Sequence, residues 1–130
     1  MGTDSTGDTN VVRIANCSGF YGDRLSAAKE MVDGGPIDVL TGDYLAELTM
    51  SILYAKKAKD PNGGFVGTLL QPVKDVLGDC IEKNTKILTN AGRLHPKALA
   101  EATQAIAPHP AGAANVARLA AADLLPLPRE

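Results

Sequence analysis

The sequence predicts an α/β fold in which helices cover both faces of a parallel sheet. Three short apolar runs, residues 11–16, 37–41 and 86–89, each lead into a loop that contains glycine, as buried strands do. Apolar residues recur at helical spacing between these runs. Strands joined by helices imply right-handed crossovers, so we expect an open, Rossmann-like sheet of about three strands in the order 2-1-3 or 3-2-1.

The first strand is predicted at residues 11–16, where the run VVRIAN is rich in β-branched residues. A helix over 24–32 follows the loop CSGFYGD and stops before Gly34, Gly35 and Pro36. The expected inner face of this helix is Leu25, Ala28, Met31 and Val32.

The second unit repeats the pattern of strand, glycine and helix. Its strand at 37–41 leads to Asp43, which opens a helix that ends at the turn DPNGG. The expected inner face is Leu45, Leu48, Ile52 and Ala55.

The third unit starts with a helix over 65–83, which Pro72 is expected to kink or divide because proline donates no backbone hydrogen bond. Asn84 suits a left-handed cap, and 86–89 is the third strand. Pro96 then lies in the first turn of a last helix. The inner faces of these two helices are Leu69, Val73, Val76, Leu77 and Cys80, and Leu99, Ala102, Thr103 and Ile106.

The chain of 130 residues suits one domain, but a doubly wound sheet usually has about five or six strands. The segment 108–130 is rich in Ala and Pro, and its single β-branched residue is Val116. We therefore expect a disordered lead-in at 1–10, the first part of a larger α/β domain at 11–107 and a tail at 108–130 that adds no strand. A truncated or frame-shifted product fits this pattern.

Composition and charge exclude several classes of protein. Hydrophobic residues make up 45% and charged residues 22% of the chain, as in ordinary globular domains. Thirteen Lys and Arg against fifteen Asp and Glu leave a formal charge of -2, which disfavours binding to nucleic acid or to an anionic membrane. Cys17 and Cys80 form no CxxC motif and the histidines do not cluster, so we expect neither a metal site nor a disulfide. No apolar run reaches the roughly 20 residues of a membrane span and the polar start lacks a secretory signal, so we expect a cytoplasmic protein.

A ligand site is expected where the strands end, since open parallel sheets bind ligands beyond the carboxyl ends of their strands. In the first loop there, Gly19 and Gly22 either let backbone amides approach an anion, such as a carboxylate or a thioester oxygen, or serve only the turn. Arg24 either meets an anionic group of the substrate or is a solvated charge. Cys17 and Ser18 are nucleophiles by chemistry, although neither lies in a GxSxG motif.

Carboxylates supply the candidate acid and base. Asp43 and Glu47 stand four residues apart, so on a helix they share one face, where they either transfer a proton or complement the helix dipole. Asp23 is a third candidate, or it caps the helix that follows. Asn90 would hydrogen-bond a ligand carbonyl while Gly92 allows close backbone approach, and a plain turn is equally consistent.

Three stretches resemble the N-terminal region of the acyclic terpene utilisation (AtuA-type) family. They are SGFYGDR at 18–24, GGPIDVLTGDYLAELTM at 34–50 and TNAG at 89–92. The resemblance spans residues 11–106. It implies a cytoplasmic protein of the kind that bacteria encode with enzymes that degrade citronellol- and geraniol-type acids as coenzyme A thioesters.

The resemblance places all but one of the candidate site residues in its shared motifs, and Tyr21 is added because it lies in the first loop. The catalytic candidates are Asp43, Glu47 and Asp23. The substrate-binding candidates are Ser18, Gly19, Tyr21, Gly22, Arg24, Gly42, Tyr44, Asn90, Ala91 and Gly92. The family tends to read NAGG and then Asn-Pro, where this chain has Arg93 and His95. The arginine replaces a glycine at a position where close approach or a positive φ would matter, and the histidine is expected to cap the last helix.

Two functions of different classes follow from these observations. The first is an enzyme that acts on an acyl-coenzyme A or branched carboxylic intermediate of terpenoid breakdown and needs no cofactor besides this acyl-CoA substrate. The alternative is a non-catalytic α/β module whose uncovered apolar surface binds a partner chain, or a second copy of itself, that completes the sheet. A third hypothesis is a marginally folded fragment with no function of its own.

Overall fold

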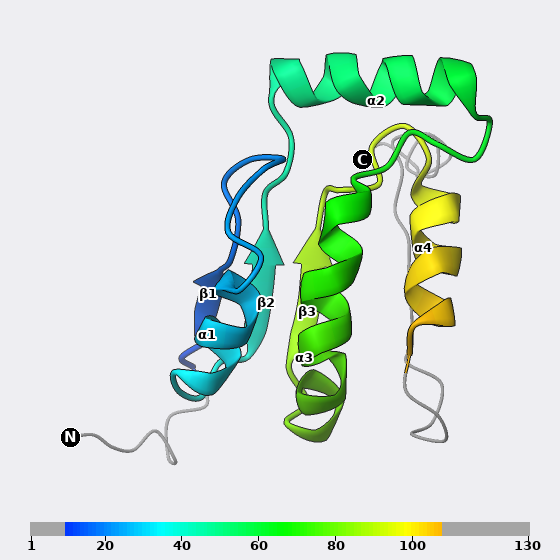
Figure 1. The fold of residues 1–130 in the computed structure, drawn as a ribbon. Coiled ribbons are helices and arrows are strands. Elements are labelled where there is room, and N and C mark those ends of the chain that lie inside the picture. The colour runs from blue at the N-terminus through cyan, green and yellow to red at the C-terminus, as the bar shows by residue number, and fades with distance from the viewer. Residues whose placement is uncertain (1–9, 108–130) are drawn as a thin grey trace, which may run out of the picture.

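The computed structural model describes residues 10–107, so the expected tail and nearly all of the expected lead-in lie outside it. The molecule has an open α/β fold built on a three-stranded parallel sheet with the order β1-β2-β3, as Figure 1 shows. The strands are β1 (Ile14–Asn16), β2 (Val39–Gly42) and β3 (Lys86–Thr89). The predicted fold class is confirmed, and 3-2-1 is the observed one of the two expected orders.

Two helices lie side by side on the same face of the sheet (Figure 1). α1 (Ala27–Asp33) connects β1 to β2, and α3 (Leu70–Glu82) continues the 3-10 turn η2 (Gly67–Leu69) and leads to β3. Pro72 was expected to divide the helix, but it lies within the first turn of α3, where a proline needs no backbone donor, and the change from 3-10 to α-helix occurs before it, between Leu69 and Leu70. The expectation that helices cover both faces is wrong for residues 10–107. A right-handed crossover puts its helix on a face that depends on the direction in which the chain moves to the next strand. Both crossovers here move in the same direction, so both helices lie on one face. In the order 2-1-3 the second crossover would move in the opposite direction and put its helix on the other face.

The strand register decides which side chains face these helices. Leu40 pairs with Ala15 on one side and Ile87 on the other, and this row packs toward α1 and α3. The adjacent rows point the other way, because side chains alternate along a strand. Ile14 and Leu88 are therefore 64% and 66% exposed, on a face that no helix within residues 10–107 covers. We call this the open face.

Two apolar clusters form the core. The first lies between α1, α3 and the sheet and comprises Cys17, Ala27, Ala28, Val32, Leu40, Val76 and Cys80. The second lies where α3 meets α4 (Pro96–Ala105) and the loops at the carboxyl ends of the strands. It comprises Tyr44, Leu53, Val66, Leu69, Val73, Leu77, Ala91 and Leu99. Both clusters contain α3 residues, and every residue of the inner face predicted for this helix is buried.

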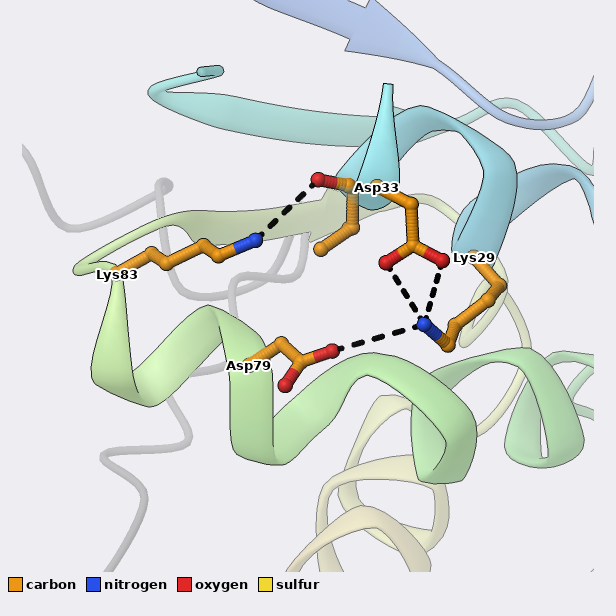
Figure 2. A network of polar contacts seen from close by, with 5 residues as sticks. Lys29, Asp33, Asp79 and Lys83 are labelled. Carbon is orange, nitrogen blue, oxygen red and sulfur yellow. Dashed lines mark hydrogen bonds and ion pairs between the residues drawn. The ribbon is translucent and has the colours of Figure 1, made fainter. Parts of the chain in front are cut away.

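Polar contacts join α1 to α3 at the outer surface (Figure 2). Lys29 lies 2.5 Å from Asp33 of its own helix and 3.9 Å from Asp79 of α3. The hydrogen bond to Asp33 raises the pKa of Lys29. Lys83 donates from Nζ to the backbone carbonyl of Val32 at 3.5 Å. Exposed ion pairs of this kind add little stability, so the apolar residues beneath them hold the two helices together.

α2 (Glu47–Lys59) differs from the prediction in its start and in its buried face. It begins four residues after Asp43, which was expected to open it. It lies across the carboxyl ends of the strands and not along the sheet (Figure 1). Its buried residues are Thr49 and Leu53, whereas Leu48 of the expected inner face is 73% exposed. Because Leu53 packs into the second cluster, beyond the ends of the strands, a different side of this helix is buried.

The remaining helix ends match the sequence in part. Asn84 has a φ of 56°, the left-handed conformation expected after α3. Pro96 is the first residue of α4, and His95 caps this helix by accepting a hydrogen bond from a backbone amide of the first turn at 3.2 Å. α1 begins at Ala27, later than the expected Arg24. Within residues 10–107, no helix is both long and apolar enough to cross a membrane.

Leu53→Ala is expected to lower the free energy of unfolding by about 2–5 kcal/mol, because this fully buried side chain fills the second cluster. The matched variant Leu48→Ala, on the exposed side of the same helix, should change it by less than about 0.5 kcal/mol. Urea unfolding followed by circular dichroism measures both. A larger loss from Leu48→Ala would mean that the face expected from the sequence is the packed one.

Candidate functional site

The carboxyl ends of the three strands meet at a shallow hollow of about 300 Å³. Its lining residues are Asn16, Thr41, Gly42, Asp43, Leu88, Thr89 and Asn90. We call it the rim hollow. Asn16, Thr41 and Leu88 form one register row of the sheet, on the side that carries the open face. The rim hollow therefore lies at the sheet edge where the sequence predicts a ligand site.

Four of the lining residues, Asn16, Thr41, Leu88 and Thr89, were not among the expected site residues. The sequence predicts a site in the loops, whereas these four residues lie in the strands themselves. A visible signal was the polar residue at or near the end of each apolar strand. Thr41 donates from Oγ1 to Asn16 Oδ1 at 3.1 Å, so the ends of β1 and β2 are joined by their side chains.

Asn90 joins the loop after β3 to the loop after β2. Its Oδ1 accepts a hydrogen bond from the backbone N–H of Tyr44 at 2.9 Å, and its Nδ2 donates to Asp43 Oδ1 at 2.7 Å. Nearby, Thr89 donates from Oγ1 to the Gly42 carbonyl at 3.0 Å. Asn90 was expected to bind a ligand carbonyl, and in the structure its side chain already holds two loops together.

Asp43 is the carboxylate of the rim hollow. Its oxygen accepts hydrogen bonds from Asn90 and, at 3.2 Å, from the backbone N–H of Leu45, and these two bonds lower the pKa of the carboxyl group. Its own backbone N–H donates to the Ser18 carbonyl at 3.0 Å, which ties the second loop to the first. Asp43 is therefore ionised at neutral pH and suited to accept a hydrogen bond, not to act as a general acid.

Glu47 does not form the expected helical pair with Asp43. It is the first residue of α2, and the preceding Ala46 is in an extended conformation with φ −144°. Asp43 lies outside the helix, so the two carboxylates do not share a helical face. The hydrogen bonds of Asp43 to Asn90 and Leu45 fix it in the loop, and Glu47 is not among the residues that line the rim hollow.

Asp23 closes the first loop on itself. Its carboxylate accepts hydrogen bonds from the backbone N–H groups of Gly19 and Arg24, each at 2.8 Å. These bonds lower the pKa of Asp23. It does not cap α1, whose N-cap position is Ser26. The Gly19 amide that was expected to meet a ligand anion thus binds a carboxylate of the chain.

Cys17 and Ser18, the two residues that are nucleophiles by chemistry, are buried beneath the rim. Ser18 is 3% exposed and donates from Oγ to the Phe20 carbonyl at 3.0 Å. Burial raises the pKa of the Cys17 thiol, which therefore stays protonated at neutral pH. Tyr44 lies against Cys17 and Gly42, and burial is the main cause that raises its pKa to about 12. These residues support the rim and are not poised for nucleophilic attack.

Tyr21, Gly22 and Arg24 contact other parts of the surface. The Tyr21 hydroxyl accepts a hydrogen bond from Lys56 of α2 at 2.6 Å, and the ammonium lies 5.1 Å from the centre of the ring. Arg24 pairs with Glu30 at 2.9 Å. A Cβ on Gly22 would lie 3.2 Å from the Phe20 ring. None of the three lines the rim hollow.

Ala91 and Gly92 are packed inside the third loop. Ala91 is fully buried, and its carbonyl accepts a hydrogen bond from the Val66 amide at 2.8 Å. A Cβ on Gly92 would lie 2.9 Å from the Pro96 backbone, so glycine is required here by close packing against α4. Arg93 does not adopt the positive φ considered for it, since among the non-glycine residues of 10–107 only Asn84 does.

The charges at the rim limit what it can bind. Its lining contains one carboxylate, Asp43, and no Lys or Arg. In the described part of the chain, no group of three or more His, Cys, Asp and Glu side chains could hold a metal ion. The rim hollow therefore offers a hydrogen-bond acceptor, amides and hydroxyls beside the apolar Leu88.

Comparison with known protein families supports the resemblance found in the sequence. The model of the family described as acyclic terpene utilisation family protein AtuA matches residues 12–130. This match includes the tail at 108–130. No curated protein and no solved structure gives a significant match.

Asn90→Ala should lower the free energy of unfolding by about 1–3 kcal/mol, because it leaves the Tyr44 amide without its partner beneath the rim. The control is Asn62→Ala, in the exposed turn after α2, which should change it by less than about 0.5 kcal/mol. Urea unfolding measures both. Equal effects of the two variants would mean that Asn90 does not hold the loops together.

Acid should destabilise the protein as the pH falls below about 4. The folded-state pKa values of Asp23 and Asp43 are lowered, so their contribution is present above the unfolded-state pKa and is lost as the pH falls through the folded-state value. Asp23→Asn should reduce stability at pH 7 and flatten its decline in acid. Urea midpoints between about pH 2 and 7 test this, and parallel curves for the two proteins would contradict it.

Proposed function

Since the chain belongs to the acyclic terpene utilisation family AtuA, we propose that it acts in acyclic terpene utilisation by binding a branched acyl thioester at the rim hollow. The observation that carries this proposal is the charge of the hollow, which has Asp43 and no cation. An acyl-coenzyme A presents a neutral carbonyl to such a site, whereas a free carboxylic acid presents a carboxylate.

Amide groups would receive the thioester carbonyl. One N–H of the Asn90 side-chain amide is used in the hydrogen bond to Asp43. One N–H of the Asn16 side-chain amide is used in a hydrogen bond to the Ser18 carbonyl at 2.9 Å. Each amide nitrogen carries a second hydrogen that can be donated to a ligand. Leu88 is an exposed residue of the open face that also lines the rim hollow, so it offers an apolar contact to a branched acyl chain.

Asp43 sets the preference between ligands. Its lowered pKa keeps it ionised at neutral pH, so a second carboxylate in the same hollow is repelled. The same carboxylate accepts a hydrogen bond from a hydroxyl or amide of the ligand. Of the three acidic candidates, Asp23 is engaged by its own loop and Glu47 lies outside the lining, so the proposal assigns a role in binding to Asp43 alone.

Isothermal titration with citronellic acid and with its coenzyme A thioester tests this proposal. The thioester should bind more tightly than the free acid. Asp43→Asn, which keeps the hydrogen-bonding shape and removes the charge, should tighten binding of the free acid roughly tenfold and change thioester binding much less.

Asp75→Asn on the exposed side of α3 is the matched control, since it removes the same charge away from the hollow. It should leave both affinities unchanged. Unesterified coenzyme A separates recognition of the acyl group from recognition of the nucleotide. No heat from the thioester, or equal binding of unesterified coenzyme A, would overturn the proposal.

A further inference from the structure

The proposed function uses one residue of the open face, Leu88, where this face borders the rim hollow, and it leaves the rest of the face unassigned. The open face presents Ile14, Val39 and Leu88, with Lys86 in the same register row as the first two. Two of its three apolar residues are more than half exposed. Parallel sheets are normally covered on both faces, because leaving such residues in water forgoes most of their hydrophobic stabilisation.

The chain continues from a point close to this face. α4 runs antiparallel to β3 at its edge of the sheet, so the described chain ends near the amino ends of the strands (Figure 1). A further 23 residues, 108–130, follow in the sequence. The family match includes them together with the strands of the sheet.

The pattern of this segment suits one helix of the right length. Pro108 and Pro110 separate it from α4, and Pro126 ends a run at 116–125 that is free of Pro and Gly. Ten helical residues span about 15 Å, close to the width of three strands spaced about 4.8 Å apart. The eight residues between Ala107 and Val116 reach up to about 26 Å when extended, enough to pass around the β3 edge.

Charge and apolar spacing in the segment complement the open face. On a helix, Val116, Leu119, Ala120 and Asp123 share one side, so an acidic residue lies within an apolar face. The open face has the matching arrangement, with Lys86 among apolar residues. No ion pair within residues 10–107 includes Lys86. We propose that residues 116–125 dock as a helix on the open face, with Asp123 against Lys86.

Thiol labelling of the full chain tests this docking. Cys17 and Cys80 are buried, so a maleimide reports chiefly on an introduced cysteine. In Leu88→Cys, the docked segment should slow labelling. Adding Leu119→Glu should release the segment and speed labelling about tenfold, since burial of one leucine is worth a factor of this order. Adding Arg118→Glu, on the opposite side of the helix, should leave the rate unchanged.

Leu48→Cys on α2 is the reference for a free site, because this exposed residue lies away from the open face.

The proposed ion pair between Lys86 and Asp123 has its own test. Lys86→Asp should speed labelling of Leu88→Cys, and the added exchange Asp123→Lys should restore the slow rate. Labelling at the Leu48→Cys rate in every background would overturn the proposal. So would protection that grows with protein concentration, which would assign the open face to a second copy of the chain.

Discussion

Right-handed crossovers that step twice in the same direction determine the shape of this molecule. From β1 to β2 and on to β3 the chain always moves one way, so α1 and α3 lie on one face. These helices bury Leu40 and leave Ile14 and Leu88 on the other side. The rim hollow opens on that exposed side, because Leu88, one of its lining residues, points to the same side of the sheet as Ile14. The candidate site and the open face thus share one topological origin.

Most of the polar groups at the rim hold the rim itself together. The carboxylate of Asp23 binds the amides of its own loop, and Asn90 joins the second and third loops. A site built on loops needs such support, since its geometry otherwise varies too much for specific binding. Asp43 is supported by these bonds and lines the rim hollow, and under the proposed function its charge selects between ligands.

The position of the rim hollow could be predicted from the sequence, but its lining could not. The three strand ends predicted the edge of the sheet at which the hollow lies, and Gly42, Asp43 and Asn90 are among its lining residues. Ala91 and Gly92 belong to the same motifs, yet they are packed against their surroundings. A motif in the sequence does not distinguish a residue that meets a ligand from one that holds the loop. Asn16 and Thr41 also line the hollow, because the strand register pairs them at the ends of β1 and β2, and neither was among the expected site residues.

By itself the sequence determined the fold class, the three strands and the buried face of α3, because short-range periodicity and the conformational limits of Pro and Gly are local properties. Only the tertiary structure decided the direction of the crossovers, the side of α2 that is buried and the partners of the rim carboxylates. Each of these depends on contacts between segments distant in the chain. Leu48 and Leu53 show the difference, since both are apolar residues of one helix and only the packing against other elements buries the second.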